Sequence, residues 1–221
     1  QGAYAQFTEY FAKEEQRIKA QVPYRSLPNG VYISETARIG PNAMIEPGVV
    51  IGAEVVIGAN AYIHTGAVIM NAVIGDNVVI NEKAVVGSSG FTMTQNENGE
   101  KIRIYSLGKV IIGNNVEIGA LDNISRGSGG DTVIEDFVKL SALVNIAHDT
   151  HLRKNVEITA GAILGGFVDA KEDSYIGLNA VVRNRVDLGA SSLIGMGATV
   201  TRSVEDNTVV AGNPAKPLRK R

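Results

Sequence analysis

The stretch Ile134–Leu164, IEDFVKLSALVNIAHDTHLRKNVEITAGAIL, carries an aliphatic residue at every sixth position. The same register continues without a slip to Val200. Its anchors are Ile134, Leu140, Ile146, Leu152, Ile158, Leu164, Ala170, Ile176, Val182, Leu188, Ile194 and Val200. A strict period of six is produced neither by the 3.6-residue turn of a helix nor by the two-residue alternation of a strand.

A coil of three short strands, with one hexad on each side, explains this period. Each coil uses eighteen residues and stacks on the next at the spacing of a β ladder, roughly 4.8 Å. The anchors then point into a continuous apolar prism, and Gly, Asn and Asp take the turns. Shorter runs of the same hexad extend from Ile33 to Ile69, from Ile74 to Val86 and from Ile112 to Ile124. The sequence therefore predicts an all-β fold, a parallel β-helix of hexapeptide repeats.

Segments outside the repeat define the predicted organisation. Residues 1–30 form an N-terminal helix and lead-in, and residues 31–204 form the β-helix. An excursion loop or hairpin interrupts the β-helix at 87–108, where KIRIY follows an Asn/Gly turn. Residues 205–221 form a C-terminal tail that leaves the β-helix. The large apolar residues of the helix, which fall near one helical face, are Phe7, Tyr10, Phe11 and Ile18.

Composition narrows the class of protein. With 221 residues and 44% hydrophobic residues, the chain can bury a sizeable core. It has no run near the roughly 20 apolar residues of a membrane span and no signal-peptide pattern, so we expect a cytoplasmic protein. The absence of cysteine excludes disulfides, a thiol nucleophile and cysteine-ligated metal. A net charge of -2 and a single basic cluster, KPLRKR, do not favour a nucleic-acid partner.

The stretch IAHDTH, residues 146–151, holds two of the three histidines. His148 follows its anchor by two positions, which places it outside the prism near a turn. Eighteen residues later, Gly166 lies above it beside Gly165, so the imidazole faces a spot without side chains. We therefore expect His148 to act as a general base and the Gly166 amide to stabilise an oxyanion when an amine or hydroxyl attacks a thioester. Asp149 or another nearby carboxylate is expected to orient the imidazole, and the spacing does not decide which.

Less specific interpretations of the histidines stand beside this one. An exposed histidine in a repeat is often an ordinary solvated residue, and this is what we expect of His151 and His64. A zinc site of three histidines, as in proteins that resemble γ-class carbonic anhydrases, needs converging imidazoles. His64 precedes His148 by 84 residues, which is more than four coils, so no metal is expected.

Three motifs carry a family resemblance. LGKVIIGNNVEIGALDNISRG, DTVIEDFVKL and NIAHDT resemble the UDP-3-O-acylglucosamine N-acyltransferases of lipid A synthesis, and GSSGFT and YAQFTEYF resemble them too. Proteins with this hexapeptide repeat resemble the left-handed β-helix family, which implies a left-handed coil here. The resemblance also implies that the general base falls on His148. Two departures are that the family's Asp-Asn pair is Ser141-Ala142 and that its second histidine is Arg185.

The C-terminal third resembles a different branch. IAHDTHLRKNVEITAGAILGG and SLIGMGATVTRSVEDNTVVAGNPAKPLRK are similar to nucleotide-sugar and sialic-acid-type acetyltransferases, which use acetyl-CoA. This resemblance also implies His148 as base and the Gly166 amide facing the thioester. The residues it implies beside the pantetheine groove are Gly165, Ala180, Gly195 and Ala198. The residues it implies at the CoA phosphates are Arg183, Lys216 and Arg219.

The expected protein is a homotrimeric enzyme that moves an acyl group from acyl-CoA, expected to be acetyl-CoA, to the amino group of a nucleotide-linked amino sugar in surface-glycan synthesis. Trimerisation follows from the resemblance and would create clefts between prisms. The expected acceptor contacts are Phe91, Tyr105, Asn123 and Arg126. One alternative is an N-acyltransferase of lipid A type that depends on acyl-carrier protein, and another is a non-catalytic β-helix scaffold.

Overall fold

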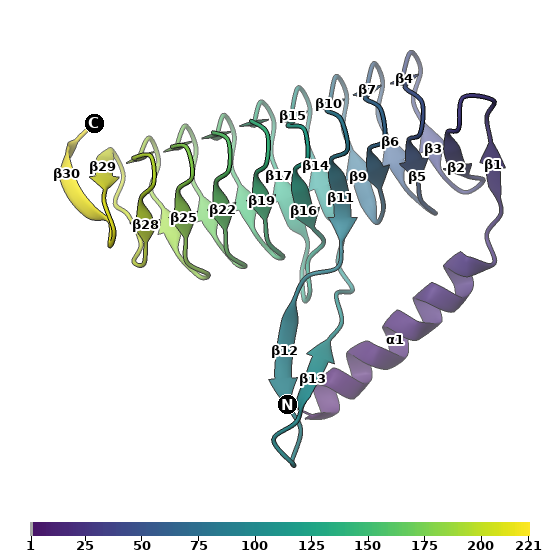
Figure 1. Cartoon of the computed structure of the whole chain (residues 1–221), viewed down its shortest axis with the longest axis horizontal. Coiled ribbons are helices and arrows are strands. Elements are labelled where there is room, and N and C mark those ends of the chain that lie inside the picture. Colours follow the sequence, from purple (N-terminus) through teal and green to yellow (C-terminus); the bar gives the residue numbers. More distant parts are fainter. Residues whose placement is uncertain (1) are drawn as a thin grey trace.

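The computed structural model describes residues 2–221, and most of them form one parallel β-helix (Figure 1). Three faces of short strands run along its axis, each pairing a strand with the equivalent strand of the next coil. Ile146 pairs with Leu164, and Leu140 with Ile158, so the ladder joins residues eighteen positions apart. The predicted hexapeptide β-helix is confirmed.

The strands of the three faces are as follows. The first face contains β1 (Tyr24–Ser26), β2 (Tyr32–Ser34), β5 (Val50–Ile51), β8 (Val68–Ile69), β11 (Val85–Ser88), β16 (Asn123–Ser125), β19 (Asn145–Ile146), β22 (Ile163–Leu164), β25 (Val181–Val182) and β28 (Thr199–Val200). The second face contains β3 (Arg38–Ile39), β6 (Val56–Ile57), β9 (Ala72–Ile74), β14 (Val110–Ile112), β17 (Thr132–Ile134), β20 (His151–Leu152), β23 (Asp169–Ala170) and β26 (Asp187–Leu188). The third face contains β4 (Met44–Ile45), β7 (Tyr62–Ile63), β10 (Val79–Ile80), β15 (Glu117–Ile118), β18 (Lys139–Leu140), β21 (Glu157–Ile158), β24 (Tyr175–Ile176), β27 (Leu193–Ile194), β29 (Thr208–Ala211) and β30 (Lys216–Lys220).

The corners of the coils place residues in the left-handed backbone region. Asn42, Asn60 and Asn77 occupy such corners in successive coils, with φ of 59°, 56° and 55°. Asparagine tolerates this conformation better than most side chains. The side-chain amide of Asn42 donates to Asn60 at 3.1 Å, and that of Asn60 donates to Asn77 at 3.0 Å. Polar ladders at the corners therefore reinforce the stacking of the apolar anchors inside.

An arm projects from the middle of the β-helix (Figure 1). It consists of the hairpin β12 (Thr92–Gln95) and β13 (Lys101–Ile104), with α1 (Gly2–Ala20) packed against β13. The ion pair between Glu15 and Arg126, 3.1 Å long, ties α1 to the β-helix. Both the N-terminal helix and the excursion were predicted, and the structure resolves the excursion as a hairpin.

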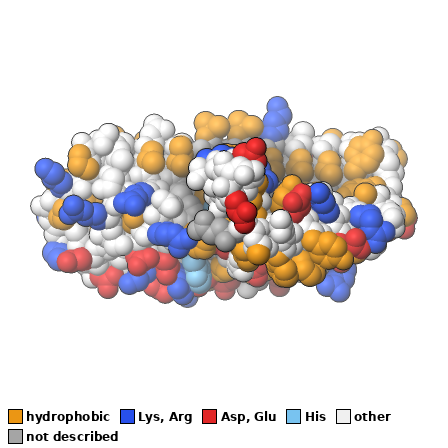
Figure 2. Space-filling view, turned by 90° about the horizontal axis from the view of Figure 1, so that it is seen from below, with side chains coloured by type: hydrophobic (Ala, Val, Ile, Leu, Met, Phe, Trp, Pro, Cys, Tyr) orange, Lys and Arg blue, Asp and Glu red, His pale blue; other side chains and the backbone are white. Residues whose placement is uncertain are grey.

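The packed face of α1 is made of small residues, because the buried positions are Ala5, Thr8 and Ala12. The large apolar side chains that the sequence places near one face point away from the chain, and Tyr10 is 67% exposed. Figure 2 looks onto the arm and shows hydrophobic side chains gathered beside it. The helix thus presents its aromatic residues to solvent, and close approach of its backbone to the hairpin explains why small residues pack.

The pairing of the β-helix continues beyond the predicted boundary at Val204. β29 pairs in parallel with β27, and β30 then turns back antiparallel to β29. This hairpin covers the end of the prism. Among the described residues, no helix has the length and hydropathy that crossing a membrane requires.

Replacing one buried anchor should destabilise the whole stack. Ile158 is 1% exposed in β21, whereas its neighbour Glu157 points outward. We expect Ile158→Ala to lower the free energy of unfolding by about 2–5 kcal/mol, because it removes buried methyl groups and leaves a cavity. Glu157→Ala should change it by less than about 0.5 kcal/mol. Urea denaturation followed by circular dichroism measures both, and equal effects would contradict the assignment of inward and outward positions.

Asp122 gives the stability a dependence on pH. It is 1% exposed and accepts hydrogen bonds from the backbone amides of Gly119 and Val144, each 2.7 Å long. Burial raises the pKa of its carboxyl from 3.8 to about 7, against the lowering effect of the two amides. The folded chain therefore holds this proton more tightly than the unfolded chain does. Its contribution to stability is present in full below about pH 4 and is lost as the pH rises to about 7.

Asp122→Asn should remove this slope. Between pH 5 and 8, the unfolding free energy of the original chain should fall relative to that of the variant. Glu46→Gln is the control, because hydrogen bonds from the Tyr62 hydroxyl and from Thr65 lower the pKa of Glu46 to about 2. Glu46 is ionised throughout that range, so its variant should show a constant difference. Parallel curves for both variants would contradict the assignment to Asp122.

Candidate active site

His148 and Asp149 form the corner between β19 and β20. Asp149 adopts the left-handed conformation, with φ of 57°, and this turns its side chain back toward the imidazole. The Oδ2 atom of Asp149 lies 2.7 Å from Nδ1 of His148. Of the carboxylates that the sequence left open, Asp149 is the one that contacts the ring.

A glycine-rich loop surrounds the Asp149 carboxylate. The backbone amides of Ser128, Gly129 and Gly130 donate to it at 2.9, 3.1 and 2.9 Å, and the Ser128 hydroxyl also donates. Burial by itself would raise the pKa of Asp149, but hydrogen bonds from His148 and Ser128 and the loop amides hold that pKa well below its usual range. An ionised carboxylate at Nδ1 keeps the proton on that nitrogen. Nε2 therefore carries the lone pair that a general base needs.

Glycines flank the imidazole on two sides. A Cβ atom on Gly166 would lie 2.8 Å from Cε1 and 2.9 Å from Nε2 of His148, and one on Gly90 would lie 2.9 Å from the Cβ of His148. The ring of Phe167 meets the imidazole edge to face at 5.3 Å, and Arg185 stacks on Phe167 at 4.1 Å. The backbone of Gly90 and Gly166 thus confines the imidazole, and a larger residue at either position would collide with it.

The Gly166 amide lies at a corner where the ladder supplies no acceptor. At equivalent corners the amides of Lys154 and Ala190 donate to carboxylates of neighbouring coils, Glu135 and Asp206. Among the described residues, none accepts a hydrogen bond from the N–H of Gly166. This amide is therefore available to a ligand, as an oxyanion donor must be.

A hollow of about 440 Å³ opens beside the imidazole. Its lining residues are Ser89, Phe91, Asn123, Ser125, Asn145, Ala147, His148, Gly166 and Asn184. Four residues predicted separately, His148, Gly166, Phe91 and Asn123, meet here. The amide of Asn123 donates to Asn145 at 3.0 Å and accepts from Ser88 at 2.8 Å. Apart from His148, the polar groups of the lining are neutral amides and hydroxyls.

Two residues predicted to contact the acceptor lie away from this hollow. The guanidinium of Arg126 is 7% exposed and is held by Glu15 and by the carbonyl of Gly108. The backbone amide of Tyr105 donates to the hydroxyl of Thr8 in α1 at 3.2 Å. Arg126 thus connects α1 to the β-helix, and Tyr105 connects the end of the hairpin to α1.

The residues predicted along the pantetheine groove are dispersed. Ala180 and Ala198 are both 0% exposed, so neither presents surface to a groove on one chain. A Cβ on Gly165 would lie 2.6 Å from the Asn184 amide nitrogen, and one on Gly195 would lie 2.9 Å from the Cβ of Ala211. These positions permit close backbone approach, which at Gly165 and Gly195 is used by the next coil or the C-terminal hairpin.

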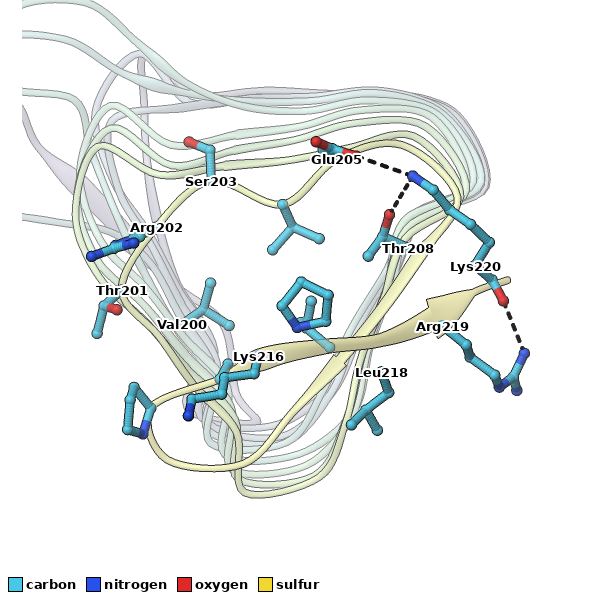
Figure 3. Close-up of a pocket in the computed structure, with 15 residues that line it drawn as sticks. Val200, Thr201, Arg202, Ser203, Glu205, Thr208, Lys216, Leu218, Arg219 and Lys220 are labelled. Carbon is cyan, nitrogen blue, oxygen red and sulfur yellow. Dashed lines mark hydrogen bonds and ion pairs between the residues drawn. The ribbon is translucent and has the colours of Figure 1, made fainter.

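A second hollow, of about 660 Å³, lies at the C-terminal end of the prism. Lys216 and Arg219, two of the predicted phosphate contacts, line it, whereas Arg183 is exposed outside it. Figure 3 shows Arg202 and Lys216 on one side of the hollow. On the other side, Lys220 bonds Glu205 at 3.1 Å and Thr208 at 3.0 Å (Figure 3). Arg202 and Lys216 therefore give one rim of this hollow a positive charge.

The remaining histidines contact carboxylates on the surface. His151 lies 2.7 Å from Glu135, and His64 lies 3.4 Å from Glu46. Within residues 2–221, histidine, aspartate and glutamate side chains form no group of three that could hold a metal ion.

Several site residues were missed in the sequence. Asn145 and Asn184 follow from the stacking, since Asn123 pairs with Asn145 across a coil lengthened by four residues and Asn184 lies eighteen residues after Gly166. Ser128 belongs to the glycine-rich loop, which is inserted where the spacing from Ile124 to Ile134 is ten residues in place of six. The position of this inserted loop one coil before Asp149 was the available signal. Thr92, whose hydroxyl lies 3.1 Å from Nε2 of His148, had no signal, because the repeat does not determine the path of the arm.

Comparison with known proteins gives two matches to family models. The GMPPB C-terminal domain matches residues 27–120, and the hexapeptide repeat of succinyl-transferase matches residues 172–202. Among curated proteins, the UDP-3-O-acylglucosamine N-acyltransferase of Delftia acidovorans is 36% identical over 127 residues, which are 58% of this chain and 38% of that protein. The Acidovorax sp. protein of the same name is 46% identical over 81 residues, which are 37% of this chain and 24% of that protein. The chain thus spans less than half the length of these relatives.

Solved structures give the same fold. UDP-N-acetylglucosamine acyltransferase of Campylobacter jejuni aligns with a TM-score of 0.77 at 24% identity, over 89% of this chain and 75% of that one. The corresponding enzyme of Bacteroides fragilis aligns with a TM-score of 0.68 at 22% identity, over 89% of this chain and 74% of that one. The expected left-handed parallel β-helix is confirmed. The repeat, the fold and the curated relatives make the chain similar to hexapeptide-repeat acyltransferases.

Proposed function

We propose that the chain transfers an acyl group from an acyl-CoA thioester to the amino group of a nucleotide-linked amino sugar. The observation that carries this proposal is the arrangement of Asp149, His148 and the Gly166 amide at one wall of the neutral hollow. It supplies a base, a group that orients the base, and a donor for an oxyanion. The similarity to proteins named UDP-3-O-acylglucosamine N-acyltransferase supports the same reaction class.

The reaction begins when the acceptor amine attacks the thioester carbonyl. His148 takes the amine proton, and the ionised Asp149 stabilises the imidazolium that forms. The Gly166 amide donates to the developing oxyanion. Collapse of the tetrahedral intermediate expels the thiolate, which receives the proton from His148, and leaves an amide on the sugar. No side chain of the protein is acylated during this reaction.

The lining of the hollow fits a sugar. Asn123, Asn145 and Asn184 present amides, and Ser89 and Ser125 present hydroxyls. Such neutral groups pair with sugar hydroxyls without the desolvation cost of a buried charge. Phe91 is 78% exposed at the edge of the hollow and offers a flat apolar surface to a sugar or base. Arg126 and Tyr105 act indirectly, by holding the arm that carries Phe91.

The donor lies along the first face in this proposal. Ile163 and Val181 point outward from successive strands and are 45% and 39% exposed, so they form an apolar strip. The strip leads from Gly165 toward the C-terminal hollow, two to three coils or roughly 10–14 Å away, with Ala180 and Ala198 buried beneath it. Arg183, Lys216 and Arg219, together with Arg202, are cations near that end that can bind the phosphates of CoA. The proposed acyl donor is therefore acyl-CoA, and acetyl-CoA is the first to test.

The assembly we propose is a homotrimer. The hollow and the apolar strip are open on the surface of one chain, and a neighbouring β-helix would enclose them. Sedimentation equilibrium at several protein concentrations measures this directly. A monomer that retains activity would show that one chain forms the complete site.

A lipid A-type reaction with acyl-carrier protein as donor is the second candidate. It is favoured by the names of the relatives, because both curated proteins described above are named UDP-3-O-acylglucosamine N-acyltransferase. It differs in the donor protein and in a longer hydroxylated acyl chain. A non-catalytic scaffold is the third candidate function, and it predicts no turnover.

Acyl transfer that requires His148 is the central expectation. Purified protein is to be incubated with acetyl-CoA, longer acyl-CoAs or acyl-carrier-protein thioesters, each with UDP-, dTDP- and GDP-linked amino sugars, and products identified by mass spectrometry. His148→Ala should lower the rate on the order of 10² to 10⁴-fold, because proton removal is lost. His151→Ala, a surface histidine of the same coil, should keep the rate of the original chain.

The outcomes of this screen separate the candidates. Transfer from CoA supports the proposed donor, whereas transfer only from acyl-carrier protein supports the lipid A-type reaction. Turnover that survives His148→Ala would overturn the proposed mechanism. The absence of product in every pairing would support a scaffold.

The space beside the imidazole can be tested with two glycine variants. Gly166→Ala places a methyl group within 2.9 Å of Nε2 of His148, so we expect the ring to shift and kcat to fall at least about tenfold. Gly129→Ala is the matched control, because its methyl group would find nothing nearer than the Tyr4 hydroxyl at 3.7 Å. Its backbone amide, which contacts Asp149, stays in place. Equal kcat for Gly166→Ala and the original chain would contradict the proposed placement of the thioester.

A further inference from the structure

The hydroxyl of Thr92 contacts the nitrogen that the proposed function assigns as base. Its Oγ1 atom lies 3.1 Å from Nε2 of His148, although the two residues are 56 positions apart. Thr92 belongs to β12 in the arm and is half-buried. Hydroxyl, imidazole and carboxylate thus form one chain of contacts, of 3.1 Å from Thr92 to His148 and 2.7 Å from His148 to Asp149.

The direction of this hydrogen bond follows from the other side of the ring. The ionised Asp149 keeps a proton on Nδ1, so Nε2 has only a lone pair. Thr92 must therefore be the donor and Nε2 the acceptor. Because Nε2 has a single lone pair in the ring plane, a substrate proton can reach it only after Thr92 moves away or through the Thr92 hydroxyl itself.

The surroundings of Thr92 oppose a movement away. The amide of Gly90 donates to the buried hydroxyl of Ser106 at 3.0 Å, and the carbonyl of Gly90 accepts from Arg103 at 2.6 Å. Thr92 itself pairs with Ile104 across the hairpin. Gly90 also packs against the imidazole. A β-branched side chain on this anchored backbone has few rotamers to adopt.

We propose that Thr92 relays the proton of the acceptor amine to His148. As the nitrogen–carbon bond forms, Oγ1 of Thr92 accepts the amine proton and gives its own proton to Nε2. The imidazolium later returns the proton through the Thr92 hydroxyl, which gives its own proton to the leaving thiolate and ends as a hydroxyl. No other reactant is needed, and one hydroxyl can donate and accept at once. This inference rests on the proposed function and adds a catalytic residue to it.

The relay places the reacting amine beside the arm. Phe91, the neighbour of Thr92, and His148 both line the neutral hollow, so an amine that contacts Oγ1 lies at the edge where arm and β-helix meet. The arm is then part of the catalytic machinery. Its ties to α1 and the β-helix hold the distance between Thr92 and His148.

Thr92→Val and Thr92→Ser test the relay with acetyl-CoA and a UDP-linked amino sugar. Valine keeps the shape of threonine without the hydroxyl, and serine keeps the hydroxyl. We expect Thr92→Val to lower kcat about 10 to 100-fold with KM nearly unchanged, and Thr92→Ser to keep kcat within a few-fold. Rates in mixtures of H₂O and D₂O should fall along a curve for the original chain, since two protons move, and along a line for Thr92→Val. Thermal unfolding of each variant shows that the fold is retained.

Each outcome bears on the proposal. Unchanged or higher kcat in Thr92→Val would overturn the relay and show that the hydroxyl only covers the base. Loss in both variants would also overturn it, because serine retains the transferable proton. An unchanged rate in His148→Ala, or no turnover by the original chain, would overturn the proposed function and the relay with it. If His148→Ala loses activity while Thr92→Val keeps it, the proposed function stands and only the relay is overturned.

Discussion

The parallel backbone ladder between coils is the constraint on which the structure depends. In the regular coils it pairs residues eighteen positions apart, so each side chain has a defined neighbour above and below. The apolar anchors satisfy this ladder from inside by stacking into one core, and each coil is stabilised only through its neighbours. The same register brings Gly166 over His148. The geometry of the candidate site is thus a consequence of the force that holds the fold together.

Interruptions of the ladder supply the chemistry that the repeat lacks. The inserted loop provides the amides of Ser128, Gly129 and Gly130, which surround the Asp149 carboxylate. The arm provides Thr92 and, through Gly90, a backbone surface against the ring. A regular coil presents few groups at its corners beyond those of adjacent coils. Two irregular segments that converge on one corner therefore distinguish this corner from all the others described.

The sequence predicts the parts of the molecule that obey the period. The anchors, the outward position of His148 and its neighbour Gly166 follow from counting in sixes and eighteens. The choice of Asp149 as partner depends on a left-handed φ at a corner and on the fold of a glycine-rich loop, which the period does not specify. Arg126 was expected to contact the acceptor, yet its guanidinium pairs with Glu15 of α1, far away in the sequence. Contacts between irregular segments are decided by packing in three dimensions, and the repeat carries no information about them.

The stacking of whole coils also restricts the distances between sites along the β-helix to multiples of the height of one coil. The corner of Gly166 and the positively charged rim at Arg202 and Lys216 are separated by complete turns of the prism. Adding or deleting one eighteen-residue coil between them would change their separation by about 4.8 Å without altering either end. Extra residues do not add a fraction of this step, because they leave the stack as a loop, as in the coil of 22 residues between Ile124 and Ile146, whose anchors both stay buried. The length of a molecule that reaches from one point to the other is therefore selected in steps rather than continuously.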